Sequence, residues 1–285
     1  MKERSEDLFK VLERKELAPT EFEILVDAPR IASKAQPGQF VILRIDENGE
    51  RIPLTVVDTD KEAGWVRLIF QVIGKSTAQL ATVMAGEALT DIVGPLGKAT
   101  DIENYGTVLL VGGGVGIAAL FPIVKGLKEA GNRVITVLGA KNKDLLILQE
   151  DCGKYSDELI LMTDDGSVGQ KGLVTDAMEE VFKREEISMA WAIGPSIMMK
   201  FCTLTAQKYD VPIYVSLNPI MIDGTGMCGG CRVTVGDSIK FACVDGPEFL
   251  GEEVDWDEFV NRMQQYRPEE LLANERYEKQ VSSNG

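Results

Sequence analysis

The chain has 285 residues, a formal net charge of −15 and a hydrophobic content of 45%. This hydrophobic content is enough for a full core, and the length predicts two or three domains. Binding to nucleic acid needs clustered Lys and Arg, so the acidic charge argues against such a partner. The sequence contains no histidine, which excludes Ser-His and Cys-His catalysis and imidazole metal ligands. Any chemistry must therefore come from cofactors.

Two segments bear on localisation. Residues 1–7 are charged and lack the apolar stretch of a secretory signal. The uncharged run 105–124 is long enough to cross a membrane, but it contains five glycines and Pro122, and we interpret it as a buried strand, loop and helix. Free thiols at Cys152 and Cys202 are typical of the reducing cytosol. The sequence thus predicts a cytoplasmic protein without a membrane segment.

Residues 1–100 have the pattern of a small β-barrel. Strand-like runs cover 20–27, 39–45, 51–57 and 65–73, and Asn48-Gly49 is expected to form a hairpin turn. Arg51–Thr55 lies in one of these runs and Gly74–Thr77 follows another. Taken alone, Arg51 is explained as an ordinary surface charge and Gly74–Thr77 as an ordinary turn. Gly74-Lys75-Ser76 resembles the end of a P-loop, but Ile69 stands where that motif needs glycine, so we reject a P-loop.

From Thr107 the pattern changes to alternating strands and helices. A strand at 107–111 leads into Gly112–Gly116, a helix to about Ala130 and a strand at 133–138. The spacing Gly114-x-Gly116-x-x-Ala119 matches a dinucleotide-binding loop, in which the helix N-terminus receives a pyrophosphate. The acidic residue that usually ends the second strand is absent. Because two lysines occupy 139–143 instead, NAD and NADP both remain open.

Two later loops follow predicted strands. Residues 163–167 follow a strand at 158–162, and 194–196 follow a strand at 189–193. Such loops bind the ligand in an open α/β sheet, although both motifs also form plain turns. The tail at 255–280 has a helical apolar pattern after a possible cap at Asp255, which predicts a packing role.

A cysteine-rich loop carries the most specific pattern. The spacing Asp223-x4-Cys228-x2-Cys231-x11-Cys243 is that of a plant-type [2Fe–2S] site with aspartate in place of the first thiolate. Interspersed glycines suit a chain that wraps closely around a cluster. Three alternatives compete: a structural zinc, which usually has paired half-sites, a disulfide, and a simple turn at Asp223.

The order of a small barrel, a Gly-rich nucleotide domain and a cysteine loop resembles the ferredoxin–NADP reductase superfamily. More narrowly, it resembles the dihydroorotate dehydrogenase electron-transfer subunits that carry FAD and [2Fe–2S]. Residues 216–231 and 241–249 look most like the small (alpha) subunits of NADH-dependent reduced ferredoxin:NADP oxidoreductase, also called sulfide dehydrogenase small subunits. The resemblance covers nearly the whole chain.

The resemblance implies three domains and the residues that serve them. These are an FAD-binding β-barrel at 1–100, an α/β Rossmann-like NAD(P)-binding domain at 101–215, and a [2Fe–2S] loop with a C-terminal helix at 216–285. The implied FAD contacts are Arg51, Pro53, Leu54, Thr55, Gln71, Val72, Gly74, Lys75, Ser76 and Thr77. The implied NAD contacts are Gly112, Gly113, Gly114, Val115, Gly116, Asp165, Gly166, Gly194 and Pro195. The implied metal ligands are Asp223, Cys228, Cys231 and Cys243.

One position departs from the family pattern. The superfamily's Arg-x-x-[Ser/Thr] motif would place arginine at position 52, which is Ile here, while Arg51 stands one residue earlier. Aspartate at position 223, in contrast, agrees with the ferredoxin:NADP oxidoreductase subunits and differs from relatives whose ligands are all thiolates.

The resemblance implies an oxidoreductase subunit with cofactors FAD, [2Fe–2S] and NAD(H). A larger subunit that carries FAD and [4Fe–4S] clusters would receive the electrons, and ferredoxin and NADP would be the final acceptors of an electron-bifurcating reaction. The alternatives are the electron-transfer subunit of an NAD-dependent dihydroorotate dehydrogenase and, in a different class, a zinc-stabilised nucleotide-binding regulator.

Overall fold

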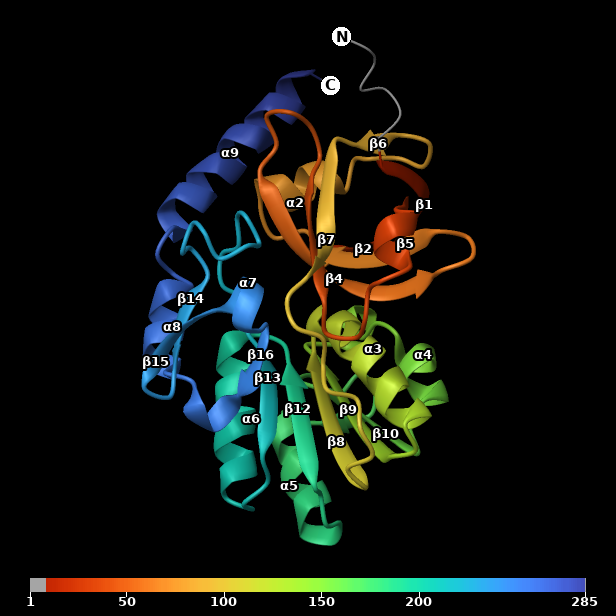
Figure 1. Cartoon of the computed structure of the whole chain (residues 1–285), viewed down its shortest axis with the longest axis vertical. Coiled ribbons are helices and arrows are strands. Elements are labelled where there is room, and N and C mark those ends of the chain that lie inside the picture. The colour runs from red at the N-terminus through yellow and green to blue at the C-terminus, as the bar shows by residue number, and fades with distance from the viewer. Residues whose placement is uncertain (1–8, 285) are drawn as a thin grey trace.

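A computed structural model describes residues 9–284 of the chain, so the charged start at 1–7 lies outside the described residues. Three regions are visible in Figure 1: a barrel formed by the first third of the chain, an α/β region below it, and a C-terminal region along one side of both. The predicted fold class, a ferredoxin reductase-like combination of barrel and α/β region, is confirmed.

The first region is a nearly closed antiparallel barrel with strand order β6-β1-β2-β5-β4-β3-β7. Two short helices, α1 and α2, lie among these strands. The bounds are β1 Phe9–Ala18, β2 Glu21–Asp27, α1 Pro29–Ala32, β3 Phe40–Arg44, β4 Arg51–Asp60, β5 Trp65–Gln71, α2 Lys75–Leu80, β6 Ala88–Leu89 and β7 Asp91–Leu96.

Alternating side chains fill the barrel. Phe22, Ile24 and Val26 of β2 point into the same core as Leu68 and Phe70 of β5. The four strands predicted here are confirmed, and Asn48-Gly49 lies in the β3–β4 hairpin, with Gly49 N–H donating to the Asp46 carbonyl (3.0 Å).

The α/β region is a sheet of order β11-β10-β9-β8-β12-β13-β16. Its strands are parallel except for the β13–β16 pair, which is antiparallel. Bounds in chain order are β8 Thr107–Gly113, α3 Gly116–Glu129, β9 Arg133–Ala140, η1 Lys143–Leu145, α4 Gln149–Lys154, β10 Glu158–Thr163, β11 Gln170–Lys171, α5 Val174–Arg184, β12 Met189–Ile193, α6 Ser196–Gln207 and β13 Ile213–Ser216.

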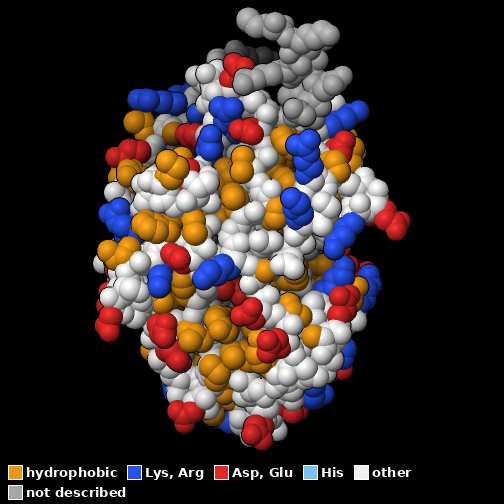
Figure 2. Space-filling model, in the orientation of Figure 1, with side chains coloured by type: hydrophobic (Ala, Val, Ile, Leu, Met, Phe, Trp, Pro, Cys, Tyr) orange, Lys and Arg blue, Asp and Glu red, His pale blue; other side chains and the backbone are white. Residues whose placement is uncertain are grey.

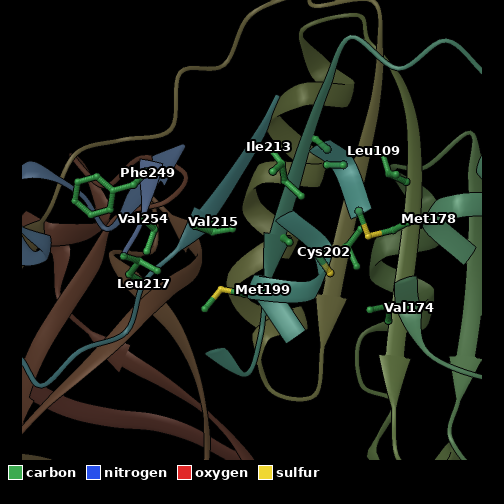
Figure 3. Close-up of a cluster of buried hydrophobic side chains, with 14 of the residues drawn as sticks. Leu109, Val174, Met178, Met199, Cys202, Ile213, Val215, Leu217, Phe249 and Val254 are labelled. Carbon is green, nitrogen blue, oxygen red and sulfur yellow. The ribbon is translucent and has the colours of Figure 1, made fainter. Parts of the chain in front are cut away.

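Helices cover both faces of this sheet. Helices α3 and α4 pack on one face, where the buried side chains include Ile117, Leu120 and Cys152. Helices α5 and α6 pack on the other face through Met178, Met199 and Cys202. Figure 3 shows that this second core continues without a break to Leu217, Phe249 and Val254 of the C-terminal region.

The C-terminal region combines a two-stranded hairpin, short helices and the edge strand β16. Its bounds are β14 Arg232–Val235, β15 Ser238–Phe241, α7 Ala242–Asp245, β16 Glu248–Leu250, η2 Gly251–Glu253, α8 Trp256–Arg262 and α9 Arg267–Asn284. The predicted cap is confirmed, because the Asp255 carboxylate accepts a hydrogen bond from Glu258 N–H (2.9 Å). Trp256 and Phe259 of α8 are buried, which confirms a packing role for the first part of this segment, whereas α9 is largely exposed.

Specific contacts join the regions. Lys125 of α3 pairs with Asp58 of β4 (3.2 Å), and Arg67 of β5 reaches Asp151 of α4 (3.3 Å). The Lys98 N–H donates to the Gly246 carbonyl (2.6 Å), which ties the end of the barrel to the C-terminal region. The positions of the two boundaries between the three predicted domains remain predictions.

The surface charge and the helices have the following features. On the face seen in Figure 2, Lys and Arg side chains are scattered among acidic ones rather than gathered into a continuous stripe. Within residues 9–284, every helix is too short or too polar to cross a membrane. The uncharged run at 105–124 forms β8 and most of α3, as predicted.

Candidate functional site

A cavity of about 650 Å³ opens at the carboxyl ends of the parallel strands, where an open α/β sheet binds its ligand. One wall belongs to the barrel and the remaining walls to the α/β region. The lining residues are Glu21, Gln71, Gly113, Gly114, Gly139, Ala140, Lys141, Leu145, Met162, Asp164, Gly172, Leu173, Val174, Thr175, Pro195, Ile197, Met198 and Phe201.

The glycine-rich loop forms the floor of this cavity. Gly114 has φ +55°, its N–H donates to the Gly139 carbonyl (2.9 Å), and the space where a Cβ would stand is open. A Cβ on Gly116 would lie 2.6 Å from the Ile193 carbonyl oxygen. Gly114 thus leaves room for a ligand, while Gly116 allows α3 to approach β12 closely.

The other predicted NAD residues lie around the same strand ends. Gly113, Gly114 and Pro195 line the cavity, whereas Gly112, Val115, Gly116 and Gly194 are not among the lining residues. Asp165 and Gly166 form an exposed turn beside it, and Asp164 takes the lining position. Hydrogen bonds from Ser167 lower the pKa of Asp165.

The predicted FAD residues belong to the barrel region, and of them Gln71 lines the cavity. Strand alternation places Arg51, Pro53 and Thr55 on one face of β4, and Ile52 is buried in the barrel core on the other. Arg51, which stands one residue before the family's arginine position, therefore shares a face with Thr55. Within the described part of the chain, no hydrogen bond or ion pair holds its side chain. Its role remains a prediction.

Helix α2 begins within the other predicted FAD segment, with Gly74 as its N-cap residue. The Thr77 hydroxyl accepts hydrogen bonds from Ile73 N–H (3.0 Å) and Gly74 N–H (3.2 Å), which fixes the turn into the helix. The space beside Gly74 is open. At the preceding strand end, Val72 N–H donates to the Thr20 carbonyl (2.7 Å), and Gln71 extends to the cavity.

The cysteine loop brings two of the predicted metal ligands into contact. The Sγ atoms of Cys231 and Cys243 are 3.2 Å apart, and both side chains are buried. Burial and the neighbouring Cys231 raise the pKa of the Cys243 thiol to about 12. Cys228 is exposed, with its Sγ 3.4 Å from Gly230 N.

Asp223 closes the same loop. Its carboxylate accepts hydrogen bonds from Thr225 N–H (2.7 Å) and Cys228 N–H (2.5 Å), and these bonds lower its pKa. In residues 9–284, no three His, Cys, Asp or Glu side chains are already arranged as a metal site. The assignment of all four ligands therefore remains a prediction.

Comparison with known proteins identifies the relatives of this chain. The iron–sulfur cluster binding domain of dihydroorotate dehydrogenase B matches residues 218–255, which include all four predicted ligands. A Thermotoga maritima protein described as a dihydroorotate dehydrogenase B (NAD(+)) electron transfer subunit homolog is 56% identical over 270 residues, 95% of each chain. The corresponding electron transfer subunit of Streptococcus pneumoniae R6 is 33% identical over 251 residues, 85% of this chain and 96% of that one. The chain belongs to the family of dihydroorotate dehydrogenase B electron-transfer subunits and their homologues.

A solved structure agrees with this family. A chain from the structure of NADH-dependent reduced ferredoxin-NADP oxidoreductase, studied for flavin-based electron bifurcation, is 54% identical to the present chain. The two superpose with a TM-score of 0.91 over 96% of this chain and 99% of that one. The resemblance inferred from the residues is therefore confirmed.

The residues present fit the cofactors that the family implies. Three thiols and a carboxylate supply the anionic donors that an iron–sulfur cluster needs. Gly224, Gly226 and Gly229 have φ of +73°, +80° and +66°, a left-handed backbone that lets the loop curve tightly. The open spaces beside Gly74 and Gly114 are suited to phosphate groups that approach the backbone. The other two cysteines, Cys152 and Cys202, are deeply buried, and burial raises the pKa of each to about 12, which makes them unreactive.

Sequence reasoning missed several cavity residues. Ile197, Met198 and Phe201 line the cavity from the first turns of α6, directly after the predicted Gly194-Pro195 loop. Their position after that loop is a signal that could have identified them. Glu21 also lines the cavity, and its only signal in the sequence is an acidic residue at the start of an apolar strand.

Proposed function

We propose that this chain is the FAD and [2Fe–2S] electron-transfer subunit of an electron-bifurcating NADH-dependent reduced ferredoxin:NADP oxidoreductase. FAD held by the barrel residues would supply hydride acceptance from NADH and release of single electrons, and a [2Fe–2S] cluster held by Asp223 and the three cysteines would supply single-electron transfer. The protein contributes binding, orientation and distance, and hydride transfer needs no side-chain acid or base. This agrees with the absence of histidine.

The observation that carries the proposal is the contact between three predicted sites. The cavity at the strand ends reaches Gln71 of the barrel, where the FAD residues begin. On the other side of the barrel, the cysteine loop packs against β3 and β7 through Gly224. NAD(H), flavin and cluster would thus occupy one continuous path.

The residues have the following roles in this proposal. Gly113 and Gly114 leave the backbone accessible to the NAD pyrophosphate, and Pro195 and Met198 enclose the adjoining part of the nucleotide. Thr77 holds the turn that faces the FAD pyrophosphate. Asp223 and the three cysteines hold the cluster.

A larger partner subunit, with FAD and [4Fe–4S] clusters, would receive the electrons and deliver them to ferredoxin and NADP in the cytoplasm. An exposed apolar surface beside the cysteine loop supports such docking. It comprises Ile222, Met227 and Val244, whose exposed fractions are 49%, 89% and 43%.

Two observations favour this function over a dihydroorotate dehydrogenase subunit. Identity is 54% to the bifurcating oxidoreductase chain and 33% to the Streptococcus pneumoniae dihydroorotate dehydrogenase subunit. The 56% identical Thermotoga maritima protein is described only as a homolog of such a subunit. Aspartate also stands at the first ligand position, as the resemblance to the bifurcating subunits implies.

The visible absorption spectrum of the anaerobically purified chain tests the proposal. Flavin and iron–sulfur bands that bleach on addition of NADH are expected. A colourless protein that contains zinc would refute it and favour the nucleotide-binding regulator. Titration with NADPH in parallel decides which nucleotide is the donor.

A further inference from the structure

Glu21 is a buried carboxyl that lacks a partner for one oxygen. It is the first residue of β2 and is 0% exposed. Its Oε1 lies 3.5 Å from Gln71 Nε2, but Oε2 has no hydrogen-bond partner among residues 9–284. Leaving a buried carboxyl oxygen unpaired costs free energy, so this position calls for an explanation.

Comparison with the next acidic residue of the same strand shows that the lack of a hydrogen-bond partner is specific to the position of Glu21. Glu23 lies two residues along on the same side of β2, and its Oε2 accepts a hydrogen bond from Arg67 Nε (2.6 Å). Glu23 does not line the cavity, whereas Glu21 does. The carboxyl without a partner is therefore the one at the ligand cavity.

The position of Glu21 selects one end of the nucleotide, an argument that rests on the proposed function. The glycine loop at Gly113–Gly114 would hold the pyrophosphate, and Lys141 and Asp164 lie at the strand ends of the α/β wall. Glu21 and Gln71 form the barrel wall, on the side where flavin would bind. The part of NAD(H) that reaches this wall must be the nicotinamide ring, because hydride passes from that ring to flavin.

We propose that the Glu21 carboxyl accepts a hydrogen bond from the carboxamide N–H of nicotinamide and so positions the ring against the flavin. The carboxamide is the hydrogen-bond donor of the nicotinamide ring, and it matches the unpaired oxygen of Glu21. Gln71, whose amide lies beside Oε1, would support the carboxyl from the neighbouring strand.

Burial raises the pKa of Glu21 to about 7. An ionised and a protonated carboxyl both keep an oxygen that accepts from an amide N–H. The contact therefore does not depend on one protonation state.

Calorimetric binding of NAD⁺ and of ADP-ribose to the holoprotein tests this role, because ADP-ribose lacks the nicotinamide ring. Glu21→Leu should weaken NAD⁺ binding on the order of tenfold, the loss expected for one hydrogen bond, and leave ADP-ribose binding unchanged. Glu21→Gln keeps an acceptor oxygen and should bind both ligands like the parent. Glu23→Gln is the matched control and should also leave both dissociation constants unchanged.

A variant with a shorter acidic side chain keeps the test informative if Glu21→Leu does not fold. Glu21→Asp withdraws the carboxyl by one methylene and should weaken NAD⁺ binding while sparing ADP-ribose. Equal weakening of both ligands, unchanged NAD⁺ binding, or loss of flavin from the variants would overturn the role assigned to Glu21. If the parent protein bound flavin but neither ligand, the NAD(H) site of the proposed function would itself be wrong, and this inference with it.

Discussion

Ile42 of β3 lies directly against Gly224 of the cysteine loop, and a Cβ on that glycine would be 2.9 Å from Ile42 Cδ1. Leu96 of β7 closes the same contact, at 2.5 Å from the Cβ position. Ile42 is also the cross-strand neighbour of Pro53, one of the predicted flavin contacts. A single residue, Ile42, therefore separates Pro53 of the predicted flavin strand from Gly224 of the predicted cluster loop.

Gly224→Ala should loosen this junction. The backbone there has φ +73°, which costs a residue with a side chain roughly 1–2 kcal/mol, and the methyl group would also displace Leu96 and Ile42. We expect a lower free energy of unfolding in denaturant and less iron per chain. Gly236→Ala is the matched control, because Gly236 has φ +56° and open space around it. Equal losses in both variants would show that the barrel contact does not matter.

Much of the fold could be predicted from local pattern, but the contacts between regions could not. The Gly112–Gly116 loop and its flanking strand and helix follow from short-range spacing. Strand β1 was missed, because its mixture of charged and apolar residues lacks a regular strand pattern, and it is held by pairing with β2. The cavity joins Glu21 to Phe201, residues far apart in sequence, and nothing local to either one indicates the other.

Asp223 can be tested as an iron ligand with two substitutions, to Asn and to Cys. Asp223→Asn keeps an oxygen that accepts from Thr225 N–H but replaces the oxygen that accepts from Cys228 N–H, so a residue needed only for the turn should lose some stability and leave the reduction potential unchanged. A ligand role predicts instead that the Asn variant loses iron or shifts in reduction potential, because the anionic donor is gone. Asp223→Cys should keep the cluster with an altered electron paramagnetic resonance signal. If the Asn variant kept the parental spectrum and reduction potential, Asp223 would be only a turn residue.

Substitutions of the two central glycines of the nucleotide loop should have different effects. Gly116→Ala places a methyl group 2.6 Å from the Ile193 carbonyl oxygen, so we expect a loss of stability of about 1–3 kcal/mol. Gly114→Ala meets no protein atom, but its φ of +55° costs a residue with a side chain roughly 1–2 kcal/mol. Its methyl group also intrudes on the cavity side, so this variant alone should raise the KM for NADH severalfold in a dye-reduction assay. Its flavin and iron content should stay at the parental level. Unchanged kinetics in Gly114→Ala would show that the pyrophosphate does not bind at this loop.

Met227 is the most exposed apolar side chain near the cysteine loop, at 89%. If a larger subunit docks there, Met227→Asp should weaken the complex by introducing an unpaired charge into an apolar interface. Reduction of this chain's own cofactors by NADH should not change. Leu12→Asp, at an exposed position on β1, serves as the control. Size-exclusion chromatography of the mixed subunits measures the effect. Equal complex formation by both variants would show that the interface lies elsewhere.

Glu248 predicts a pH dependence of stability. Its carboxylate accepts hydrogen bonds from Thr100 Oγ1 (2.6 Å) and Trp191 Nε1 (3.3 Å), yet burial raises its pKa from 4.5 to about 7. The folded state therefore holds this proton more tightly than the unfolded state, so the free energy of unfolding should fall as pH rises from about 4.5 to about 7, by at most about 1.4 kcal/mol per pH unit. Glu248→Gln should flatten that slope in denaturant titrations, whereas Glu252→Gln, at an exposed position on η2, should not. A parental slope in Glu248→Gln would assign the pH dependence to another group, with Glu21 the next to test because burial raises its pKa in the same direction.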